Sequence, residues 1–203
     1  MNETAQLAKF TAEMTYDKLP AQAVAVAKQC ILDWLGVAIR GAHEEPAKIL
    51  RSVALKMCGT GDATVFDGGS RRIDAYNAAM VNGAASHTLD FDDLHNASII
   101  HLATVVVPAA MAVAEAEHKS GRALLAAVCA GYEAGARAGE AIIPESYFYW
   151  HTTGTAGIFG SDMTQRCSIL YTAGRARACW PSNEALDISQ VKSLRLGETV
   201  IRF

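Results

Sequence analysis

The densest group of reactive side chains lies in one short stretch near the middle of the chain. Imidazoles and carboxylates follow one another there at His87, Asp90, Asp92, Asp93, His95 and His101. A carboxylate beside an imidazole fixes the tautomer of the ring and raises its pKa, so that the ring can donate or accept a proton near neutral pH. This combination predicts acid–base chemistry in the stretch.

A second candidate centre is the sequence Trp150-His151-Thr152-Thr153-Gly154-Thr155. A histidine followed by hydroxyl residues and a glycine can stand at a helix start. Free backbone N–H groups and the positive end of the helix dipole attract anions at such a position. We therefore expect an anionic group to bind near His151 and Thr153.

Two other interpretations of the first stretch are open. The aspartates can cap a helix, and a histidine such as His87 suits the C-terminal end of one. A metal site is the second alternative, since imidazole and carboxylate groups are both metal ligands. The spacing matches no strong metal signature, because Ala97 stands where a DDxxD motif needs its last aspartate. We therefore expect no metal and no other cofactor.

Helices must position both centres, because apolar residues recur at helical spacing over most of the chain. The expected helices start at Asn2, Pro20, Pro46, Asp74, Thr104 and Ser120, and a brief extended segment covers 61–69. The apolar faces expected to point inward are Val24, Ala27, Ile31 and Leu35 in the second helix, and Ile49, Leu50, Val53 and Met57 in the third. The predicted fold class is all-α, a helical bundle.

Three glycines fall on one face of the last expected helix, which runs from Gly121 to about Ile142. Gly131, Gly135 and Gly139 are spaced four apart, and this spacing permits close contact with a neighbouring helix.

Composition limits the possible functions. The chain has 203 residues, 51% hydrophobic and 19% charged, with a formal net charge of −3, so nothing favours nucleic acid or an anionic membrane as a partner. The first residues do not resemble a signal peptide, and the apolar stretch 102–116 is too short to cross a bilayer. The five cysteines form no CxxC motif and predict free thiols. We expect a cytoplasmic protein without a membrane partner.

The motif from Asn82 to Asp93, followed by His95 and His101, resembles the signature of the MmgE/PrpD family. That family includes 2-methylcitrate dehydratase, cis-aconitate decarboxylase and iminodisuccinate epimerase. Ile31–Ala38, Gly131-Tyr132-Glu133 and Trp150–Gly160 are similar to further family elements, so that the resemblance covers roughly residues 5–160.

The resemblance implies a lyase that moves a proton next to a carboxylate of a small di- or tricarboxylate, in a site between a large helical domain and a smaller α/β lid. It implies no metal for the decarboxylase and epimerase chemistry, and we expect a homo-oligomer. Asp90, His101 and His151 match the family's active-site positions, and Asp93, His95 and Thr153 are the expected substrate-binding residues.

The sequence departs from the family pattern at Leu94, where a threonine is usual, at Leu102, where a proline is usual, and after Gly160. Residues 161–203 carry six basic and four acidic side chains, and only 191–196 alternate like a strand. We therefore expect a helical domain over 1–160 and a non-matching tail over 161–203 that lacks the family's catalytic lysine. An alternative to the lyase follows, namely a truncated and catalytically inactive member of the family.

Overall fold

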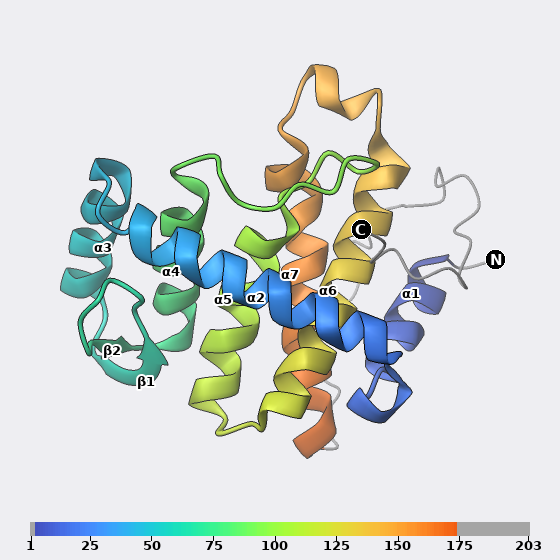
Figure 1. Ribbon diagram of the computed structural model, residues 1–203, viewed down its shortest axis with the longest axis horizontal. Coiled ribbons are helices and arrows are strands. Elements are labelled where there is room, and N and C mark those ends of the chain that lie inside the picture. The colour runs from blue at the N-terminus through green and yellow to red at the C-terminus, as the bar shows by residue number, and fades with distance from the viewer. Residues whose placement is uncertain (1–2, 174–203) are drawn as a thin grey trace.

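The chain folds into α-helices with one short β-hairpin, as a computed structural model of residues 3–173 shows (Figure 1). The helices are α1 (Glu3–Ala12), α2 (Ala21–Gly41), α3 (Glu45–Met57), α4 (Ala75–His87), α5 (Leu102–Ala116), α6 (Gly121–Ile142) and α7 (Thr152–Ala173). Strands β1 (Thr60–Thr64) and β2 (Arg72–Ile73) pair antiparallel, and two 3-10 turns cover Tyr16–Lys18 and Ser146–Phe148. The mostly helical fold and the extended segment near 61–69 are both confirmed.

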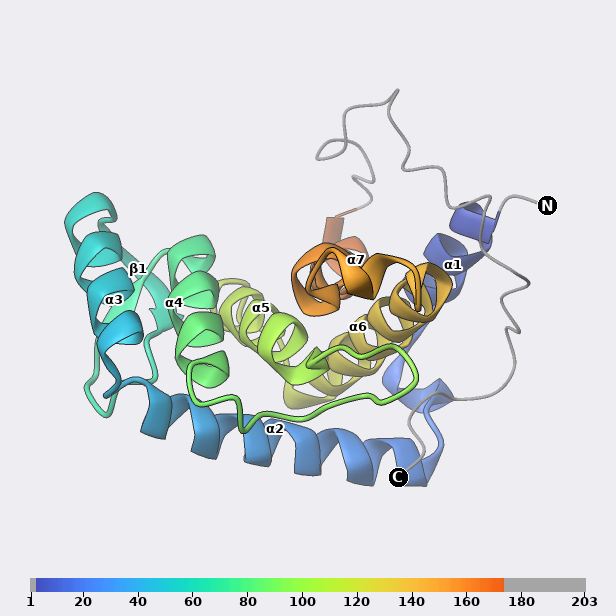
Figure 2. The same ribbon diagram turned by 90° about the horizontal axis from the view of Figure 1, so that it is seen from above.

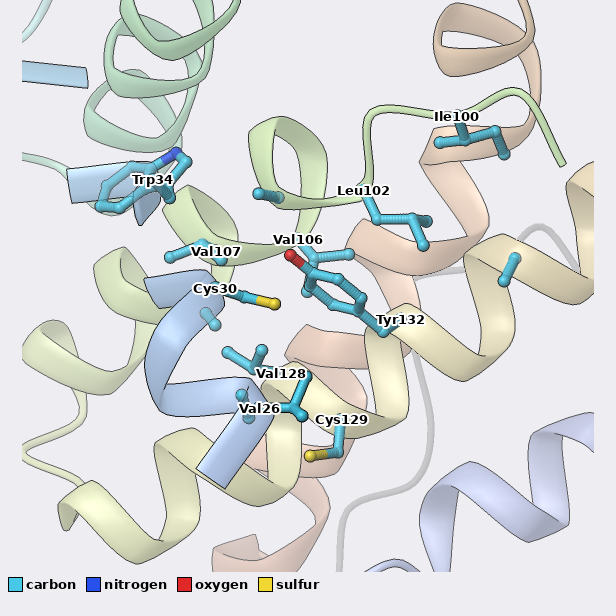
Figure 3. Close-up of a cluster of buried hydrophobic side chains, with 14 of the residues drawn as sticks. Val26, Cys30, Trp34, Ile100, Leu102, Val106, Val107, Val128, Cys129 and Tyr132 are labelled. Atoms are coloured by element: carbon cyan, nitrogen blue, oxygen red, sulfur yellow. The ribbon is translucent and has the colours of Figure 1, made fainter. Parts of the chain in front are cut away.

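Helix α2 runs along one side of the molecule beneath α4, α5 and α6 (Figure 2). Its buried face is centred on Cys30 and Trp34, which pack against Val106 and Val107 of α5 and Val128 of α6 (Figure 3). Of the inward face expected for this helix, Ala27 is buried, and the other three residues only flank the core as half-buried side chains. The face that is buried in the structure is the one that carries Trp34.

Helix α3 corrects the prediction more strongly, because most of its expected inward face points to solvent. Ile49, Val53 and Met57 are exposed, Met57 by 80%, and the fully buried residues of the helix are Ala47 and Ala54. Helix α3 lies at one end of the molecule and packs against α4 (Figure 2), and its covered side carries Ala54 with the half-buried Leu50 and Leu55. Helical periodicity therefore located the helix but not the face that is covered.

Helix caps follow the sequence at two helices and depart from it at a third. Asp74 accepts a hydrogen bond from the backbone N–H of Asn77 at 3.0 Å, and Ser120 accepts one from Ala123, as expected for N-caps. Thr104 does not cap α5, which begins two residues earlier. Its hydroxyl instead donates to the carbonyl of Gly83 at 2.8 Å and so ties α5 to α4.

The close helix contact predicted from the three glycines is present, and α7 makes it together with the chain that leads into α5. A Cβ atom added at Gly131 would lie 2.0 Å from Thr164 Oγ1 and 2.9 Å from the carbonyl oxygen of Gly160. One added at Gly139 would lie 2.5 Å from Ile100. Glycine is required along this seam because a side chain would occupy the space of the neighbouring backbone.

Helix α2 is the one helix of the described chain that is long and apolar enough to cross a membrane by length and composition. Its buried face lies in the core against α5 and α6, and a core helix passes the same test. Helix α7 continues through residue 160 to Ala173. The rest of the expected tail, with the alternating residues 191–196, lies outside the described residues, as does the expected helix start at Asn2.

Candidate active site

An open groove lies between α4, α5 and the first turns of α7 and has a volume of about 470 Å³. Small and apolar residues such as Gly83, Pro108 and Ile158 form most of its wall, while His87, His151 and Thr153 bring polar groups to it. Among the described residues that line it, none is a lysine or an arginine. Any positive charge that these lining residues offer to an anion must come from imidazole or from a helix start.

The irregular segment 88–101 places the predicted acidic cluster beside His87, which lines this groove. Figure 1 shows it leaving α4, passing the ends of α6 and α7, and returning into α5. Asp90 and Ile99 both adopt positive φ angles, 50° and 51°. This conformation is uncommon outside glycine and is easier for Asp than for a β-branched residue such as Ile.

Asp93 anchors the segment rather than lining the groove. Its carboxylate accepts hydrogen bonds from the backbone N–H of Ala103 at 2.7 Å and from the hydroxyl of Tyr132 at 2.8 Å. Burial raises the pKa of this carboxyl and that of the Tyr132 hydroxyl, and it raises the pKa of the neighbouring Cys30 thiol to about 11. Asp93 thus serves as the side-chain cap of α5 and fixes the entry of His101 into that helix.

Three imidazoles meet beside the groove, although they come from the end of α4, the start of α5 and the start of α7, and two of them, His87 and His151, line it. The ring centroid of His87 lies 4.9 Å from that of His101 and 5.6 Å from that of His151. The centroids of His101 and His151 are 6.3 Å apart. The backbone N–H of His101 donates to Thr153 Oγ1 at 3.1 Å, which joins the two helix starts directly.

Asp92 lies behind two of these rings and is the best-shielded carboxylate of the cluster. Its side chain is 0% exposed, and both of its oxygens lie near His87 Nδ1, at 2.9 and 3.2 Å. His101 Nδ1 lies 3.4 Å from the same carboxylate. The hydrogen bond to Asp92 is the main reason why the pKa of His87 is raised.

Asp90 stands on the solvent side of the cluster, with its side chain 84% exposed and Oδ1 3.7 Å from His101 Nε2. His101 therefore lies between two carboxylates, one buried and one open to solvent. The His101 side chain itself is 14% exposed. An imidazole in such a place can exchange a proton with a bound molecule.

The same cluster is where a cation could be held. One ligand atom each from His87, Asp90, Asp92 and His101 lies within 4.8 Å of the others. These are the same residues that make the imidazole–carboxylate contacts described above.

The structure brings Asp90, His101, His151 and Thr153 together and places the other predicted site residues around them. His95 is tied to the segment itself, with Nδ1 2.8 Å from Ser98 Oγ, and burial lowers its pKa. Two further members of the cluster, His87 and Asp92, belong to the stretch in which acid–base chemistry was predicted, but they were not among the predicted site residues, and a structural role was open for both. Their residue types pointed to chemistry, whereas their pairing depends on the turn after α4, which brings the two side chains together.

Similarity to known proteins identifies the family of this chain. Residues 5–165 match the MmgE/PrpD N-terminal domain, so the chain belongs to the MmgE/PrpD family. A cis-aconitate decarboxylase-like protein, oryM, of Aspergillus oryzae is 31% identical over 82% of this chain and 36% of its own length. A cis-aconitate decarboxylase of Aspergillus terreus is 27% identical over 68% of this chain and 29% of its own length. The chain thus spans about a third of the length of these curated relatives.

Proposed function

We propose that this chain carries the helical side of a lyase-type active site that moves a proton next to a carboxylate of a small di- or tricarboxylate. The observation that carries the proposal is the meeting of three imidazoles and two aspartates in one cluster, of which His87 and His151 line the groove. Groups of this kind can take a proton from carbon or return one to it while neighbouring charges stabilise the intermediate.

His101 and His151 are the proposed proton-transfer groups, because the starts of α5 and α7 bring their ring centroids to 6.3 Å from each other. Free N–H groups at the start of α7, together with the hydroxyl of Thr153, would bind a carboxylate of the substrate. Asp90 would orient and polarise His101 from the solvent side. Each role uses a side chain of the segment or of the first turn of α7.

The proposed first substrate is cis-aconitate, since the relatives that cover most of this chain are named for its decarboxylation. Loss of carbon dioxide leaves an electron pair on carbon, and a proton from an imidazole would complete the product. The test is an assay of the purified chain with cis-aconitate, in which carbon dioxide and the product are both quantified. Turnover that His101→Ala abolishes and His43→Gln preserves supports the proposal. Absence of turnover in a folded chain contradicts it.

A second candidate is a family member that does not catalyse the reaction. It is favoured by the absence of lysine and arginine from the described lining of the groove, because a tricarboxylate needs several positive partners. Calorimetric titration of cis-aconitate separates the two candidates. Neither binding nor turnover in a folded chain identifies the inactive member.

We also propose that the chain forms a homo-oligomer through α3. Ile49, Val53 and Met57 are exposed at spacings of four along this helix, and exposed apolar patches mark association surfaces. Light scattering after size exclusion should give more than one copy, and Val53→Asp should reduce the assembly to one copy. A wild-type monomer would contradict this proposal.

The cytoplasm is the proposed location, because free thiols such as Cys30 and Cys58 suit a reducing compartment, and cell fractionation tests it.

A further inference from the structure

The contact between His87 and His151 carries more information than their shared position at the groove. The two Nε2 atoms lie 3.4 Å apart at hydrogen-bonding geometry, and the ring planes differ by only 18°. Two neutral imidazoles can share such a contact only if one nitrogen carries the proton and the other accepts it. The tautomers of the two rings are therefore linked.

Asp92 decides which of the two arrangements is present. An ionised carboxylate only accepts hydrogen bonds, so the ring nitrogen that faces it, His87 Nδ1, must carry a proton. In the neutral ring, His87 Nε2 is then the acceptor, and His151 Nε2 must be the donor. Because the Asp92 side chain is fully shielded from solvent, water does not compete for this contact.

We propose that Asp92 and His87 are positioning residues that set the tautomer of His151 and exchange a proton with it during the reaction. The inference rests on the proposed function, since it describes how one of its proton-transfer groups is prepared. When His151 gives its Nδ1 proton to the substrate carbon that has lost carbon dioxide, an imidazolium at His87 passes its Nε2 proton to His151 Nε2. Both rings are then neutral in the arrangement described above, and one proton from solvent recharges His87 beside Asp92 for the next turnover.

Three features of the surroundings support a relay rather than a purely structural contact. His87 lines the groove and is one-third exposed, although it ends a helix whose neighbouring residues Ala85 and Ser86 are buried. The charged and titratable groups that face it are Asp90, Asp92, His101 and His151. The bond to Asp92 raises the pKa of His87, and this is what the protonated state of a relay needs.

The first test uses histidine side-chain nitrogen NMR on the full chain, at a pH well above the ordinary histidine pKa of about 6.5. We expect His87 to be protonated at Nδ1 and His151 at Nε2. In His87→Gln the Nε2 preference of His151 should be lost, and in Asp92→Asn both rings should change tautomer, while His43→Gln should leave them unchanged. A His87 protonated at Nε2 in the wild type, or a His151 spectrum that His87→Gln does not alter, overturns the inference.

The second test separates positioning from substrate binding. With cis-aconitate as substrate, His87→Gln should lower kcat by about 10- to 100-fold, the range usual for outer partners of site histidines, with little change in KM. A rise in KM at unchanged kcat would overturn the relay. The nitrogen spectra need no turnover. Failure of the proposed function therefore shows as absent turnover with linked tautomers, and failure of the inference shows as unlinked tautomers.

Discussion

Two neighbouring regions differ in how they are packed: the glycine-lined seam between α6 and α7, and the cluster of histidines at the end of the seam where α7 begins. The seam has no room for a residue larger than glycine, since an added Cβ at Gly131 would fall within 3 Å of both a side chain and a backbone oxygen. The cluster is polar, partly open to solvent and built on an irregular segment. The seam fixes the position of α7 against α6, and the start of α7 places His151 against His87. The placement of the proposed proton-transfer groups thus depends on a region that takes no part in the chemistry.

The largest expected effect lies in the seam. Gly131→Ala should lower the free energy of unfolding by roughly 3 kcal/mol or more, the upper range for overpacking, because backbone lies in the way. Gly36→Ala is the matched control, since nothing lies within 4 Å of an added Cβ there. It should stabilise the chain by about 0.5–1 kcal/mol through helix propensity. Urea unfolding measures both, and equal effects at the two positions would refute the close-packed seam.

The next effect belongs to the cluster and should leave the seam intact. His101→Gln should lower kcat about 100-fold, which corresponds to roughly 2.7 kcal/mol of barrier, while the helical circular dichroism stays unchanged. Steady-state assays with cis-aconitate measure the loss. If His101→Gln retained full activity, the imidazole at the start of α5 would have no part in proton transfer.

A smaller effect is expected where the two regions join, at the hydroxyl of Tyr132 on α6. Tyr132→Phe removes the donor that Asp93 uses, and an unsatisfied buried acceptor costs about 1–3 kcal/mol. Chemical unfolding measures this loss of stability. The pKa of Asp93, which burial already raises, should rise further without this donor. A variant as stable as the wild type would show that Asp93 does not depend on α6.

The smallest effect concerns pH. The raised pKa of His87 means that its contact with Asp92 stabilises the folded chain fully below about pH 6.5, and that the stabilisation is lost as pH rises through the raised value. The stability difference between the wild type and His87→Gln should therefore shrink with increasing pH. Unfolding curves at several pH values test this, with exposed His43→Gln as control. A difference that grew with pH would contradict the assigned direction.

The sequence predicted helices better than it predicted faces. Caps at Asp74 and Ser120 and the spacing of Gly131, Gly135 and Gly139 are local signals, and the structure confirms them. The exposed face of α3 was not predictable, because apolar periodicity does not say whether a neighbour exists to cover it. The start of α5 was not predictable either, because it is set by the side chain of Asp93, nine residues before the helix begins.

The candidate site shows the same limit. Asp90, His101 and His151 were expected as a group from family resemblance, and the structure places them near one another. The roles of His87 and Asp92 depend on how the turn after α4 and the start of α7 lie in the tertiary structure, which the sequence pattern does not contain. Asp93 was expected to bind substrate, and its bonds to Ala103 and Tyr132 place it behind the site. Its predicted role stays a prediction.

The central claim is that His101 and His151 move a proton next to a carboxylate of the substrate. The most direct measurement is incubation of the purified full chain with cis-aconitate in deuterated water, followed by NMR of the carbon-bound hydrogens. We predict deuterium on a carbon next to a carboxylate, at a rate that falls about 100-fold in His101→Gln. Substrate recovered unlabelled and unconverted from a folded chain, or labelling that His101→Gln does not slow, would contradict the account.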